Sequence, residues 1–94
     1  MEQTTQLKRF PLGRVVITPG ALAALMPDAA ATGLKRHAAG DWGDVAKADQ
    51  GLNDEALRVG ERLLSVYADC KGTKFWIITE WDRSVTTVLL PDEY

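Results

Sequence analysis

The stretch Lys74-Phe-Trp-Ile-Ile-Thr-Glu-Trp-Asp-Arg-Ser-Val-Thr-Thr-Val-Leu-Leu90 decides the fold. Two runs rich in Val, Ile, Thr, Phe and Trp, at 74–80 and 85–90, lie on either side of the polar turn 81–84. Side chains of these types suit a pleated, partly buried surface. The stretch therefore predicts an antiparallel hairpin. Both of its faces carry apolar groups, so both faces need cover.

The segment 53–70 predicts a long helix that packs against one face of this hairpin. Asn53 is a favourable N-cap, and two acidic residues follow it in the first turn, where negative charge is stabilising. Small and apolar residues recur at helical spacing along one stripe. That stripe comprises Ala56, Val59, Gly60, Leu63, Val66, Tyr67 and Cys70. We expect Cys70 to lie in the core.

The N-terminal half predicts shorter elements. Residues 1–9 read as a loose arm and 14–17 as a short extended segment. Thr18 followed by Pro19 is typical of a helix start, and the alanine-rich 28–35 favours a second short helix. Since 94 residues accommodate a single core, we expect one α+β domain over 1–94, with an antiparallel sheet built on the C-terminal hairpin.

Two glycines frame an acidic loop around Trp42. Gly40 and Gly43 lie three residues apart, a spacing that indicates a tight loop with backbone angles that favour glycine. We expect Asp41 or Asp44 to accept backbone hydrogen bonds there.

Composition limits the compartment and the partners. The net charge is −2 and the basic residues are scattered, which makes nucleic-acid binding an unfavoured function. Cys70 is the single cysteine, the N-terminus is polar, and no apolar run approaches the roughly 20 residues that span a membrane. These features predict a cytoplasmic protein without membrane association.

Four polar residues could serve catalysis. A carboxylate base (Glu80), a histidine acid (His37) and an arginine (Arg36 or Arg83) are the ingredients of metal-independent RNA cleavage. The competing interpretation is that His37 caps a helix end and that the carboxylates satisfy loop backbone groups. The sequence alone commits none of the four to catalysis.

The same region does not predict a metal centre. The spacing of His37, Asp41, Asp44 and Asp49 matches neither zinc nor calcium patterns. We therefore expect neither a metal nor another cofactor.

The tryptophans suggest a binding surface. Trp81 lies in the hairpin turn, where a large ring is hard to bury, next to Asp82 and Arg83. Together with Trp42 these residues are the predicted binding residues, since exposed aromatic and arginine side chains are typical of interface hot spots. The alternative is that Trp81 folds back over the core.

Three motifs carry a resemblance that covers residues 10–94. They are Leu-Gly-Arg-Val-Val-Ile-Thr-Pro-Gly-Ala from 12, Arg-His-Ala-Ala-Gly-Asp-Trp-Gly-Asp-Val from 36, and Trp-Ile-Ile-Thr-Glu-Trp-Asp-Arg-Ser-Val-Thr-Thr-Val-Leu-Leu-Pro-Asp-Glu-Tyr from 76. The chain resembles a family of short, uncharacterised bacterial proteins that look like cargo of plasmids, integrative elements and phages. The resemblance implies an accessory role in a mobile element, including counter-defence, and implies no catalytic residue.

The functional hypothesis is therefore a non-enzymatic accessory protein of mobile genetic elements that binds another protein. The alternative is a small metal-independent ribonuclease or toxin that uses His37, Glu80 and Arg83. A homodimer remains open.

Overall fold

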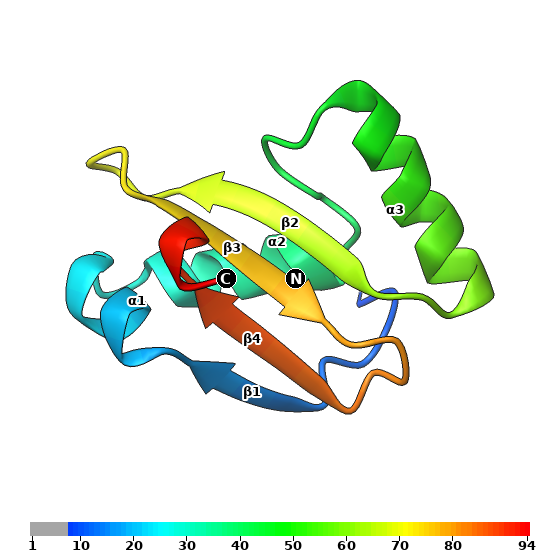
Figure 1. Cartoon of the computed structure of the whole chain (residues 1–94), viewed down its shortest axis with the longest axis horizontal. Helices are drawn as coiled ribbons and strands as arrows, with labels where there is room; N and C mark the ends of the chain where they lie inside the picture. Colours follow the sequence, from blue (N-terminus) through cyan, green and yellow to red (C-terminus); the bar gives the residue numbers. More distant parts are fainter. Residues whose placement is uncertain (1–7) are drawn as a thin grey trace, which may run out of the picture.

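The computed structural model describes residues 8–94, which form a four-stranded sheet with helices (Figure 1). In chain order the elements are β1 (Arg14–Ile17), α1 (Pro19–Ala24), α2 (Ala29–Ala38), α3 (Lys47–Val59), β2 (Leu63–Ala68), β3 (Lys74–Thr79), β4 (Val85–Leu89) and the 3-10 helix η1 (Pro91–Glu93). The strand order is β1-β4-β3-β2. The expected α+β class is confirmed. The sheet is mixed, because β1 pairs parallel with β4 while the other pairs are antiparallel.

Strands β3 and β4 lie where the sequence places the hairpin. Trp76 pairs with Leu89, and Thr79 pairs with Thr86. The alternation directs Phe75, Ile77 and Thr79 to one face, where their exposure is 1%, 0% and 0%. This face carries the main core.

The predicted helix over 53–70 is wrong. Helix α3 begins six residues earlier, at Lys47, and ends at Val59, since Gly60 adopts a left-handed conformation with φ +82°. The residues that follow form strand β2, in which Leu63, Ser65 and Tyr67 are buried and their neighbours are less so. Apolar residues over 63–70 fit a period of two as well as the helical period. Gly60 ends the helix before these residues, and pairing with β3 makes them a strand.

Cys70 is consequently misplaced by the helical prediction. It lies in the turn between β2 and β3, and its thiol is exposed instead of buried.

Helix α2 takes the place of the predicted long helix on the sheet. It crosses behind β2 and β3 in Figure 1, and its Gly33 lies on the Phe75 ring, where a Cβ would come within 2.9 Å of Cε2.

The core beneath α1 and α2 comprises Ala21, Ala29, Tyr67, Phe75, Ile77 and Val88. A second cluster near α3 comprises Phe10, Trp42, Ala56 and Leu63. Helix α1 starts as expected, with the Thr18 hydroxyl accepting from the Ala21 amide at 3.2 Å.

The C-terminal residues cover part of the opposite face. Figure 1 shows η1 in front of the sheet and α2 behind it. The Tyr94 ring packs against Trp76 with centroids 5.4 Å apart, and its hydroxyl accepts from Arg62 at 2.7 Å. Glu93 accepts from the Thr18 hydroxyl at 2.6 Å and from the Leu90 amide at 2.8 Å. The tail is therefore held against Trp76 of β3 and against Thr18, the residue that follows β1.

The outer edge of β2 is closed by residues from two other segments. The side-chain amide of Asn53 on α3 donates to the Leu64 carbonyl at 2.7 Å, and its oxygen accepts from the Leu64 amide at 3.2 Å. The Trp42 carbonyl accepts from the Val66 amide at 3.1 Å, and the Asp44 amide donates to the Val66 carbonyl at 2.7 Å. All four outward-facing backbone groups at Leu64 and Val66 thus have partners.

No helix within residues 8–94 combines the length and apolar character needed to cross a bilayer.

Truncation of Leu63 tests the packing of β2, the strand that was predicted to be helical. Leu63 is 0% exposed and belongs to the Phe10, Trp42 and Ala56 cluster. Leu63→Ala should lower the free energy of unfolding by about 2–5 kcal/mol, because it removes buried methyl groups and leaves a cavity. Urea denaturation measures this, with the exposed Leu52→Ala on α3 as control. Equal losses in the two variants would contradict the packing described.

Candidate functional site

The Trp42 loop has the left-handed glycine conformations that the sequence predicts. Gly40 and Gly43 have φ values of +82° and +74°, in the left-handed region. The Asp41 carboxylate accepts from the Gly43 amide at 3.2 Å and from Arg36 Nε at 2.7 Å. These donors, the Arg36 guanidinium first, lower the pKa of Asp41. The loop prediction is confirmed.

Trp42 itself belongs to the interior and not to an accessible surface. Its side chain is 4% exposed and stacks on Phe10 with centroids 6.3 Å apart. Its Nε1 donates to the Asp54 carboxylate at 2.9 Å. As the structure stands, Trp42 can position the loop but cannot anchor a partner.

His37 lies at the centre of a buried polar network. It is 0% exposed, near the C-terminal end of α2, and its ring makes edge contacts with the stacked rings of Phe10 and Trp42. Its Nδ1 is 2.6 Å from the Ser65 hydroxyl on β2, and its Nε2 is 2.9 Å from the Thr79 hydroxyl on β3. Burial, with a smaller contribution from the Arg83 charge, lowers the pKa of His37 to about 4. The imidazole is therefore neutral at pH 7.

One backbone carbonyl fixes the direction of every hydrogen bond in this network. The Thr86 hydroxyl donates to the Leu12 carbonyl at 2.7 Å, so Thr86 must accept from Thr79, which lies 2.7 Å away. Thr79 has then used its proton and must accept from His37 Nε2–H. The remaining nitrogen, Nδ1, accepts from Ser65. The tautomer of His37 follows from this order, with the proton on Nε2.

The four residues of the ribonuclease hypothesis have separate structural partners. Arg36 pairs with Asp41, and its guanidinium lies 4.6 Å above the Tyr67 ring. Glu80, with a side chain 34% exposed, lies 3.3 Å from Arg62 Nε. His37 has no exposed surface and both ring nitrogens are engaged. No solvent-accessible acid–base pair made of His37 and Glu80 exists in this structure, so the structure gives this hypothesis no support.

The hairpin turn holds the remaining predicted residues. Trp81 is 66% exposed. Asp82 accepts from both the amide and the hydroxyl of Ser84, at 3.1 and 2.6 Å, and these bonds lower the pKa of Asp82. Arg83 adopts a positive φ of 61°. Its guanidinium donates to the carbonyls of Glu61 at 2.6 Å, Glu80 at 3.2 Å and Ala56 at 3.2 Å. Asp82 and Arg83 therefore shape the turn that presents Trp81.

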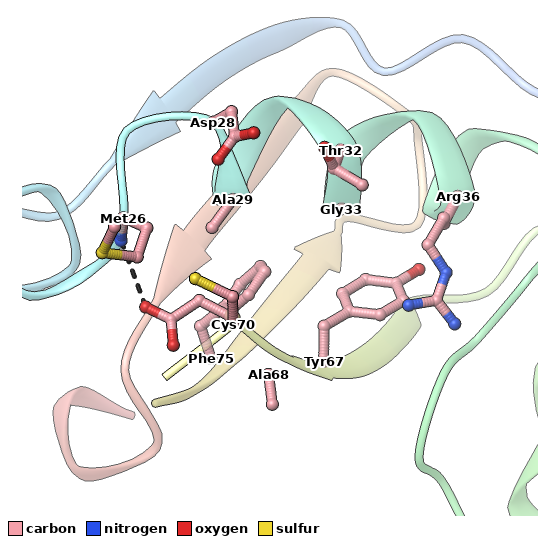
Figure 2. A pocket seen from close by; sticks show the side chains of 11 residues that line it. Met26, Asp28, Ala29, Thr32, Gly33, Arg36, Tyr67, Ala68, Cys70 and Phe75 are labelled. Carbon is pink, nitrogen blue, oxygen red and sulfur yellow. Dashed lines mark hydrogen bonds between the residues drawn. The ribbon is translucent and has the colours of Figure 1, made fainter. Parts of the chain in front are cut away.

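A cavity of about 210 Å3 lies between α2 and the end of β2 (Figure 2). Phe75, Tyr67 and Cys70 line it below α2, and Arg36 closes one end. Asp69 at its rim accepts from the Met26 amide at 3.1 Å and from the amides of Lys71 and Thr73. Its carboxylate therefore stabilises the surrounding turns. Within residues 8–94 no group of three or more His, Cys, Asp or Glu side chains is arranged to hold a metal ion.

Sequence reasoning missed the polar residues that surround His37, and it took Asn53 for a helix N-cap, whereas Asn53 lies inside α3 and pairs with the Leu64 backbone. Ser65, Thr79 and Thr86 occupy inward positions of their strands, where apolar residues are expected. Polar residues at inward positions of strands indicate a buried polar network. This signal can be read only when 63–68 is recognised as a strand.

Acid should destabilise the fold through His37. Its pKa is about 4 in the folded chain and about 6.5 when unfolded, so the unfolded state binds more protons between these values. The part of the folding free energy that depends on neutral His37 is fully present above pH 6.5 and is lost as the pH falls towards 4. We expect a loss of about 2 kcal/mol between pH 7 and pH 5. Urea denaturation at both values, with His37→Gln as the variant that lacks the titrating group, measures this.

The variant His37→Gln should lose much less stability over the same interval. The carboxylates with lowered pKa values, such as Asp41 and Asp82, titrate below it in both proteins. An unchanged pH dependence in the variant would show that His37 is not responsible.

Comparisons with known proteins return no relative. No family model, no curated protein and no solved structure matches the chain. The resemblance of residues 10–94 to mobile-element proteins stays a prediction, and the functional interpretation rests on the contacts described above.

Proposed function

We propose that the protein is a non-enzymatic binding module that recognises another protein through the turn between β3 and β4. The observation that supports this is Trp81, a large aromatic side chain that is 66% exposed on a turn with a fixed backbone. Tryptophan is enriched among residues that dominate binding energy, because it buries a large area when a partner covers it.

The turn is preorganised for such a contact. Three carbonyl oxygens hold the Arg83 guanidinium, and Asp82 accepts two bonds from Ser84. Gly13 lies against the backbone carbonyls of Arg83 and Ser84, where a Cβ would collide with both oxygens. A surface that is already ordered loses less conformational entropy on binding, which leaves more of the contact energy for affinity.

The surroundings of Trp81 have the character of an interface rim. Arg83 ties the turn to the C-terminal end of α3 through Ala56, and Val59 at that end is 47% exposed. Arg62 and Glu80 form an exposed ion pair next to the turn. An apolar centre with charged residues around it is the usual anatomy of a protein-binding patch.

The biological setting of the proposal comes from the resemblance. We place the module among accessory proteins of plasmids, integrative elements or phages, with a host protein as the partner and counter-defence as one setting. The buried, fully engaged His37 is the reason why we prefer binding to the ribonuclease alternative.

Loss of the Trp81 ring should weaken partner binding by about 30-fold, corresponding to about 2 kcal/mol for a hot-spot residue. Affinity capture from bacterial lysate with wild type, Trp81→Ala and Leu52→Ala tests this. Leu52 is 67% exposed on α3, so it controls for general surface hydrophobicity. Partners should be retained by Leu52→Ala and lost by Trp81→Ala. Equal recovery by both variants would remove Trp81 from the interface.

Removal of the Arg83 guanidinium should loosen the turn while leaving Trp81 in place. Arg83→Ala loses three charge-assisted hydrogen bonds, and we expect about 1–2 kcal/mol less stability and weaker partner binding. Arg58→Ala is the matched control, since the one ion pair of Arg58 within residues 8–94 is with the exposed Glu55. Thermal unfolding and the lysate capture measure both effects. Full partner recovery by a destabilised Arg83→Ala would contradict preorganisation.

A further inference from the structure

The two edges of the sheet differ in a way that bears on binding. At the β2 edge, the Asn53 side chain and residues 42–44 take all four outward backbone groups of Leu64 and Val66. At the β1 edge, no element within residues 8–94 pairs on the side away from β4. Figure 1 shows the lower side of β1 facing no strand or helix.

The hydrogen bonds to β4 show which groups of β1 point outward. Arg14 donates to the Ser84 carbonyl at 2.9 Å, and Thr18 donates to the Val88 carbonyl at 3.0 Å. Because alternate residues of a strand face opposite neighbours, the amides and carbonyls of Val15 and Ile17 face away from β4. Their side chains are 41% and 38% exposed. Such an edge is a template for a further strand.

We propose that β1 binds an extended segment of a partner protein by strand addition, and that this segment is acidic at one end and apolar at the other. The outward groups of Val15 and Ile17 repeat every two residues. An extended backbone matches this repeat and a helix does not.

The acidic end follows from the charges beside the start of β1. A shallow groove of about 560 Å3 runs along residues 8–13 and Val15, with Lys8 and Arg9 in its lining, and Arg14 begins the strand. None of these three cations forms an ion pair with another residue of 8–94. The acidic side chains of neighbouring segments, Asp82 and Glu93, already accept internal hydrogen bonds.

The apolar end follows from a small pocket at the other end of β1. It has a volume of about 80 Å3 and is lined by Ile17, Leu22, Leu25, Met26 and Ala30, among others. Arg14 and Ile17 are three residues apart, or about 10 Å along a strand. The occupant therefore carries its acidic and apolar side chains about three residues apart.

This charge pattern disfavours a second copy of the chain as the occupant. Pairing of β1 with β1 of another molecule would bring a second Arg14, and the Lys8 and Arg9 that line the groove next to Val15, to an edge that is already basic. Like charges brought together at an interface oppose association.

Peptide titration of the full chain tests the proposal. The probes are acetyl-Glu-Glu-Val-Thr-Val-Leu-amide and its reversed sequence, since strand addition can be parallel or antiparallel. We expect one of them to bind, with the largest NMR shifts at the amides of Val15 and Ile17. Replacing both glutamates by lysine should weaken binding at least tenfold. Two further peptides carry N-methyl groups on one or the other set of alternate amides. Only one of these sets faces β1, so one of the two methylated peptides should fail to bind.

Two protein variants distinguish the contribution of the β1 backbone to peptide binding from the contribution of its basic charge. Val15→Pro removes one outward donor, and proline suits a strand position whose amide faces solvent, so the bonds of Arg14 and Thr18 to β4 should remain. Arg14→Glu should reverse the preference between the glutamate and lysine peptides. Val15→Pro should bind at least tenfold more weakly. If that variant does not fold, the N-methylated peptides still provide the test with wild-type protein.

Several results would overturn the proposal. They are no binding of either glutamate peptide, equal binding of the two N-methylated peptides, or shifts that map to another surface. A dimer in sedimentation that is broken by Val15→Pro would assign the edge to a second copy instead. Trp81→Ala should bind the peptides like wild type, so failure at this edge and failure at the Trp81 turn are distinguishable.

Discussion

The rest of the structure depends on a line of hydrogen bonds that crosses three strands and ends on one carbonyl. His37 on helix α2 is hydrogen-bonded to Ser65 of β2 and to Thr79 of β3. Thr79 in turn donates to Thr86 of β4. Thr86 donates to the Leu12 carbonyl, in the segment that leads into β1. Each hydroxyl donates once and accepts once, apart from Ser65 at the start. One helix, three strands and the N-terminal segment are thus held in a single register.

Such a line explains why polar residues occupy the middle of the core. A buried hydroxyl or imidazole without a partner is costly, whereas a fully paired group is tolerated. Among residues 8–94 no buried side-chain nitrogen or oxygen lacks a partner. The alternatives to the observed register would leave several of these groups unpaired at once, so the network selects one arrangement even where its net energy is modest. It also engages both ring nitrogens of His37, for which the sequence left a catalytic and a structural role open.

Prediction from sequence succeeded where local chemistry decides the outcome. The β-rich runs of 74–90 and the glycines at 40 and 43 required no knowledge of distant residues. It failed over 53–70, where Leu63, Val66 and Tyr67 have helical spacing, whereas in strand β2 Val66 faces away from Leu63 and Tyr67. The strand forms because β3 is available as a partner. His37 was ambiguous for the same reason, since its partners lie 28 and 42 residues away. The position of Trp81 in a turn left two possibilities open, exposure or packing back over the core, and in the structure its side chain is 66% exposed.

The parallel pairing of β1 with β4 has a consequence for biosynthesis. Ile17 pairs with Val88, and the bond from Thr86 to Leu12 spans 74 residues of chain. A ribosome makes β1 long before β4, so β1 has no neighbouring strand to pair with until residues 85–89 have been made. Contacts between such distant residues slow folding and prolong the exposure of apolar segments. During translation β1 is therefore the segment most in need of protection from premature association.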